Sequence, residues 1–107
     1  MPENIDGDLK KLSELIVLDF NLEPEKELFD IVHLDELQEK LEKIVAYLLD
    51  NDFERLLNAM YRLDIDEEKF KVAITGLSGN SASKEIAKLI INREIRKLQT
   101  RIKYSGH

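Results

Sequence analysis

Two acidic clusters carry residue types that could bind a metal cation. They comprise Asp50, Asp52 and Glu54, and Asp64, Asp66 and Glu68. Carboxylate oxygens are the ligands that magnesium and calcium prefer. However, an EF-hand loop that starts at Asp50 would need Gly and Glu where the chain has Arg55 and Tyr61. Acidic residues also cap helix starts, so we interpret both clusters as capping groups and predict no metal site.

The loop from Gly76 to Lys84 is rich in Gly and Ser and invites comparison with phosphate-binding loops. A P-loop needs a second Gly five residues after the first, followed directly by Lys and Ser or Thr, whereas here the second Gly follows after three residues. Backbone amides at a helix start, together with Ser81, Ser83 and Lys84, could still bind an anion. An ordinary connection between helices is the simpler interpretation.

No residues in this sequence form a recognisable catalytic set. The two histidines, His33 and His107, are far apart in the chain and have no metal-binding spacing. The chain has no cysteine, which excludes disulfides, thiolate metal ligands and thiol nucleophiles. Nothing places a nucleophile beside a base. We therefore predict no catalytic residue, no cofactor and no enzyme activity.

Charge is distributed unevenly along the chain. Residues 1–68 hold 20 acidic and 7 basic residues, whereas residues 69–107 hold 2 acidic and 9 basic residues, within a net charge of −6. Such asymmetry indicates either a basic surface for a partner or two segments that neutralise each other. The basic residues from Lys84 to Lys103 are dispersed around their predicted helix, although a nucleic-acid-binding helix should gather them on one side. Nucleic-acid binding therefore stays the alternative, and mutual neutralisation is favoured.

The elements that hold these residues are predicted to be helices. Apolar residues spaced by three and four, namely Leu34, Leu37, Leu41, Ile44 and Leu48, predict a helix over 34–49. A wider apolar face predicts a second helix over 52–63, formed by Phe53, Leu56, Leu57, Met60 and Tyr61. A short third helix holds Phe70, Ala73 and Ile74 and ends at Gly76. A long helix over 82–103 follows, with its first half deep in the core.

Residues 1–33 are less regular. Leu9, Leu12 and Ile16 permit a helix, while residues 15–20 could equally form a short buried strand. Pro24 favours a helix start that would run over 24–31. The first residues are acidic and polar, and no segment reaches the length of a membrane span, so we expect a cytoplasmic protein.

The long last helix offers a surface for a partner. From Ile91 onward its apolar residues narrow to a seam of the kind that one helix presents to another. The other helices of a 107-residue chain could be too short to cover the distal part of this seam. We therefore predict a protein partner or homodimer contact there, formed by Ile95, Leu98, Arg101 and Ile102.

Several segments resemble a small bacterial protein family of unknown function. The resemblance covers residues 45–104 and is carried by Tyr47-Leu48-Leu49, by Asp52-Phe53-Glu54-Arg55-Leu56-Leu57, by Tyr61 to Lys69, by Ile86-Ala87-x-Leu89-Ile90-Ile91-x-Arg93-Glu94 and by Thr100-Arg101. It implies a bacterial, cytoplasmic, helical protein and no particular activity.

Together these patterns predict one all-α domain over residues 1–107, a compact bundle of four or five helices with a long C-terminal helix. The predicted function is that of a non-enzymatic protein-interaction or homodimerisation module. The alternative is a nucleic-acid-associated accessory protein that uses its basic C-terminal helix.

Overall fold

Every regular element in the described part of the chain is an α-helix. A computed structural model describes the backbone of residues 5–20, 33–76 and 81–105, and the side chains of residues 9–20, 33–76 and 81–100. These ranges hold five helices and no strand: α1 (Ile5–Asp19), α3 (Leu34–Asn51), α4 (Phe53–Leu63), α5 (Glu67–Thr75) and α6 (Ala82–Ser105). The predicted all-α fold with a long C-terminal helix is confirmed.

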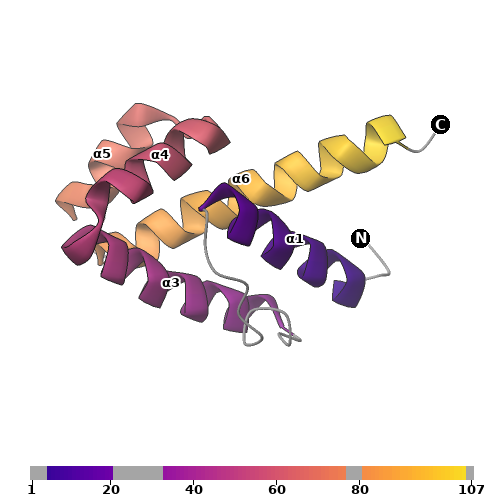
Figure 1. Cartoon of the computed structure of the whole chain (residues 1–107), viewed down its shortest axis with the longest axis horizontal. Coiled ribbons are helices and arrows are strands. Elements are labelled where there is room, and N and C mark those ends of the chain that lie inside the picture. Colours follow the sequence, from indigo (N-terminus) through magenta and orange to yellow (C-terminus); the bar gives the residue numbers. More distant parts are fainter. Residues whose placement is uncertain (1–4, 21–32, 77–80, 106–107) are drawn as a thin grey trace.

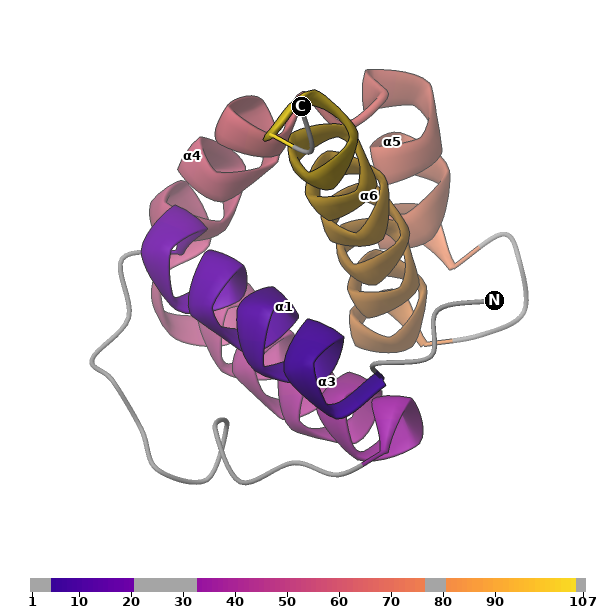
Figure 2. The ribbon, with the colours of Figure 1, turned by 90° about the vertical axis from the view of Figure 1, so that its right-hand side faces the viewer.

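Helix α6 is the axis on which the other helices pack. Its 24 residues span about 36 Å at 1.5 Å per residue, within a compact molecule of 41 × 28 × 24 Å. Helices α3 and α5 make the most extensive contacts with it, and α1 and α4 also pack on it. Figures 1 and 2 show these four helices arranged around α6. The core is aliphatic apart from Phe20 and Phe70 and includes Ile86, Ala87 and Ile90 of α6.

One residue of each acidic cluster caps a helix start, as the positions of the clusters in the sequence predicted. A side-chain oxygen of Asp52 accepts a hydrogen bond of 3.3 Å from the backbone amide of Arg55 at the start of α4. Asp66 does the same for Glu68 at the start of α5, at 2.8 Å. Each contact satisfies a backbone N–H that has no partner within its helix. Asp52 also ends α3, so the break between α3 and α4 is a true boundary.

Two helices end at residues in the left-handed conformation. Gly76 follows α5 with φ 73°, a conformation that glycine adopts without strain. Asp64 follows α4 with φ 57°, and the amide of Ile65 reaches back 3.1 Å to the carbonyl of Met60. This return of the chain satisfies carbonyls that the last turn of α4 leaves open.

The structure changes some sequence interpretations. Leu15 to Asp19 are helical, so the strand alternative for residues 15–20 is wrong. On α3 the buried residues are Leu37, Leu41, Val45 and Leu48, whereas Leu34 is exposed. Ile44 is only partly buried, and the buried position beside it is Val45. The helix predicted over 24–31 lies outside the described residues.

Candidate functional site

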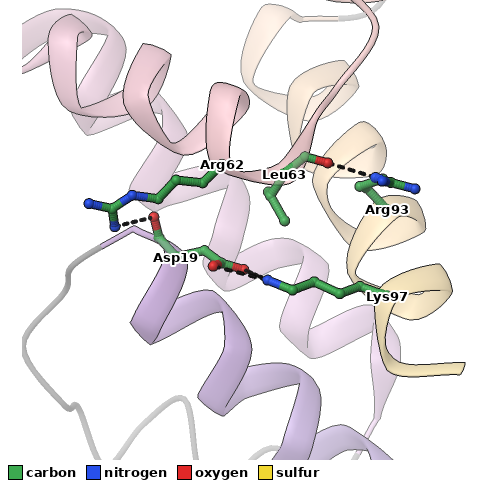
Figure 3. Close-up of polar contacts among 5 residues, drawn as sticks. All are labelled: Asp19, Arg62, Leu63, Arg93 and Lys97. Atoms are coloured by element: carbon green, nitrogen blue, oxygen red, sulfur yellow. Dashed lines mark hydrogen bonds and ion pairs between the residues drawn. The ribbon is translucent and has the colours of Figure 1, made fainter. Parts of the chain in front are cut away.

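Charged side chains from three helices meet where α1 and α4 end against α6 (Figure 3). The ammonium of Lys97 on α6 lies 2.9 Å and 3.1 Å from the carboxylate oxygens of Asp19, the last residue of α1. Arg62 of α4 donates a hydrogen bond of 3.3 Å to the backbone carbonyl of the same residue. Two cations therefore lie at the C-terminal end of α1, which carries partial negative charge.

A cation from α6 also contacts the C-terminal end of helix α4. The Nε of Arg93 on α6 donates a hydrogen bond of 2.6 Å to the carbonyl of Leu63, the last residue of α4. The guanidinium also lies 4.0 Å from the carboxylate of Asp64. We call Asp19, Arg62, Arg93 and Lys97 the interhelical clamp. Within it Lys97 neutralises Asp19 across helices, and Arg93 lies close to the carboxylate of Asp64. These two contacts are examples of the internal pairing that the charge distribution favoured.

A pocket of about 230 Å³ lies beside the clamp. Its lining residues come from α1, α4 and the turn before α4: Asp19, Phe20, Asp52, Glu54, Arg55, Asn58 and Arg62. Arg55 is paired with Asp52 at 3.3 Å, and Asp19 is held by Lys97. Among the residues that the structure describes, no group of three or more His, Cys, Asp or Glu side chains could hold a metal ion. Most charged side chains that line this pocket therefore already make contacts within the fold.

The predicted anion-binding residues act as a helix start. The hydroxyl of Ser81 accepts a hydrogen bond of 3.2 Å from the backbone amide of Lys84, so Ser81 caps α6. The hydroxyl of Ser83 lies 3.5 Å from that of Ser81. The Lys84 side chain is exposed. Residues 77–80 of this loop lie outside the described residues, so anion binding there stays a prediction.

The residues of the predicted partner contact have different environments. Leu98 is only 8% exposed and belongs to the core, and Ile95 is partly buried against it. Both therefore have neighbours within their own chain. The side chains of Arg101 and Ile102 lie outside the described residues. The two described residues of the predicted contact are therefore largely covered by their own chain, and the contact itself stays a prediction.

Three of the five basic residues of α6 whose side chains the structure describes lie near acidic groups of the same chain. Arg93 and Lys97 belong to the clamp, and Lys88 lies 3.6 Å from Glu85. A nucleic-acid surface would need these cations free to meet phosphates. The observed contacts agree with the dispersed positions of the basic residues along the sequence.

An exposed apolar surface on α4 was not predicted. The sequence placed Phe53, Leu57 and Tyr61 on the same apolar helix face as Leu56 and Met60. In the structure the residues of α4 that enter the core are Leu56, Ala59, Met60 and Leu63. Phe53 is 41% exposed, Tyr61 is 72% exposed and Leu57 is partly buried. We call these three residues the α4 stripe. Their spacing of four residues, next to the core face, was the available signal.

A second pocket, of about 300 Å³, lies between α5 and α6 and is partly apolar. Val72 and Leu89 line it, together with Ala73. Charged residues of both signs surround it, namely Glu68, Lys69 and Glu85. This mixed rim favours no particular charge in a partner.

Comparisons with known proteins do not add to the interpretation of these surfaces. Comparisons with models of protein families, with curated proteins and with solved structures find no match for this chain. The resemblance over residues 45–104 therefore stays a prediction. Among the described residues, no helix combines the length and the apolar character needed to cross a membrane.

Proposed function

We propose that this protein is a non-enzymatic interaction module that binds a protein partner or a second copy through the α4 stripe. The observation that carries the proposal is the exposure of Phe53 and Tyr61 on one side of a helix whose other apolar side is buried. Aromatic residues are enriched where protein interfaces are formed, because they offer a large contact area with few rotatable bonds.

The roles of the polar groups support an interaction function. Asp52, Asp66 and Ser81 cap helices, and Asp19 and Lys97 join them. Groups held in this way are not poised for proton transfer or nucleophilic attack. Phe53 and Tyr61, by contrast, are exposed, and only Leu57 of the stripe also packs against the core.

Capture of partners from a lysate of the native cell tests the proposal. Wild type and the double variant Phe53→Ser/Tyr61→Ser would be compared, with and without nuclease, and the bound proteins identified by mass spectrometry. Tyr47→Ser is the matched control, because Tyr47 is 63% exposed on α3, outside the stripe. Proteins captured by wild type and Tyr47→Ser, but lost with the double variant, would support the proposal. Capture that ignores the stripe, or that disappears with nuclease, would contradict it.

A further inference from the structure

The edge of the α4 stripe carries an acidic residue. Glu54 lies three residues before Leu57 and seven before Tyr61, so helical geometry places it on the same side as both, next to Leu57 and two turns before Tyr61. It is exposed and has no ion pair among the described residues, whereas its neighbour Arg55 is tied to Asp52. The stripe therefore combines apolar side chains with one unpaired negative charge among the described residues, at Glu54.

The C-terminal end of α6 has the complementary composition. Residues 95–105 hold four basic residues and no acidic one, interspersed with Ile95, Leu98 and Ile102. Lys97 is used by the clamp, but Arg96 is exposed, and Arg101 and Lys103 follow in the next turns. Figure 1 shows this end of α6 running past the other helices.

The two surfaces cannot meet within one molecule. Figure 1 shows α4 and the C-terminal end of α6 toward opposite ends of the long axis. In two copies placed antiparallel, however, the α4 stripe of each would lie near the α6 end of the other. Such an exchange is self-complementary and closes as a twofold dimer, with no surface left to propagate a chain.

We propose that the occupant of the α4 stripe is a second copy of this chain, which contributes the basic C-terminal end of its α6. This inference rests on the proposed function and names the partner. Phe53, Leu57 and Tyr61 supply the apolar contact, and Glu54 faces the region of Arg101. Charge complementarity between Glu54 and the basic end of α6 selects this pairing over a contact between two stripes, where the two copies of Glu54 would repel each other.

Charge reversal with sedimentation equilibrium tests the pairing. Wild type should dimerise in a concentration-dependent way, and both Glu54→Lys and Arg101→Glu should weaken the dimer about tenfold or more by placing like charges together. Mixing the two variants should restore association to near the wild-type level, because both contacts of the mixed dimer then join opposite charges. Glu67→Lys on α5 and Lys84→Glu at the start of α6 are matched controls at exposed positions and should leave the dissociation constant unchanged.

Each other outcome contradicts a stated part of the proposal. A strict monomer up to about 200 μM, well above the micromolar range of weak complexes, would overturn self-association. Capture of another protein through the stripe would then leave the proposed function standing. Association that Arg101→Glu does not weaken, or that mixing does not restore, would overturn the pairing of α4 with α6. Circular dichroism of every variant separates these results from loss of fold.

Discussion

The ammonium of Lys97 lies 2.9 Å and 3.1 Å from the two carboxylate oxygens of Asp19, which precedes it by 78 residues. Asp19 ends α1, and the last turn of that helix has no basic residue of its own. A carboxylate at this end adds to the partial negative charge of the helix and is unfavourable by itself. Lys97 offsets both charges, and so joins the N-terminal helix to the central one.

Removing either partner of this pair should destabilise the protein. Asp19 is buried and Lys97 is partly buried, so Lys97→Met leaves a carboxylate with little water around it. We expect each of Asp19→Asn and Lys97→Met to lower the free energy of unfolding by about 1–2 kcal/mol, and the double variant to lose about 1 kcal/mol less than the sum. Urea denaturation of all four proteins measures this coupling.

The ion pair between Lys71 and Glu68 is the control for this cycle. Its side chains are 68% and 83% exposed and 3.9 Å apart. Exposed pairs of this kind contribute between zero and about 1 kcal/mol, so Lys71→Met should change stability by less than about 0.5 kcal/mol. Equal effects at Lys71 and Lys97 would show that the clamp has no special role.

Arg93 should protect the end of α4. Its Nε hydrogen bond to the carbonyl of Leu63 closes a group that the helix itself leaves open. Arg93→Met is expected to cost about 1 kcal/mol and to speed amide hydrogen exchange at Asp64 and Ile65, whose N–H groups bond the last turn. Arg93→Lys keeps the charge and loses the planar donor, so it should recover only part of the protection. Unchanged exchange at both amides in Arg93→Met would contradict this role.

Local chemistry explains which parts of the fold could be predicted. The helix boundaries at Asp52, Asp66 and Gly76 depend on side chains and backbone angles within a few residues. They can therefore be predicted from the local sequence. The same holds for the long last helix. Internal neutralisation was also predictable from the charge distribution, although the individual pairs were not.

Packing between distant segments explains what could not be predicted. Phe53 and Tyr61 fit an apolar helix face, but only the positions of the other helices decide which side of that face is covered. Glu94 shows the opposite case. A charged residue is expected at the surface, yet the Glu94 side chain is fully buried, because it lies three residues after Ile91 and four before Leu98 on the core side.

Substitution of Gly76 should lower the stability of the protein because of the backbone conformation at this position. Its φ of 73° lies in the left-handed region, and a Cβ atom added there would meet no atom within 4 Å. Gly76→Ala should therefore cost about 1 kcal/mol through backbone strain without any steric clash. Gly76→Asn should cost less, because Asn tolerates this conformation better. Thermal unfolding of both variants measures the difference, and an alanine variant as stable as wild type would contradict the left-handed end of α5.

Raised salt should weaken the isolated monomer slightly. The clamp joins the acidic N-terminal part of the chain to basic residues of α6, and partly exposed attractions of this kind are screened by salt. Between about 0.05 M and 0.5 M sodium chloride we expect a loss below about 1 kcal/mol in the free energy of unfolding. Denaturation at a protein concentration low enough to exclude dimers measures it. Lys97→Met should show a smaller salt dependence than wild type, because one screened attraction is already gone. Stability that is flat or improved by salt would mean that internal pairing does not dominate, and would return the basic residues of α6 to consideration as a surface for an outside partner.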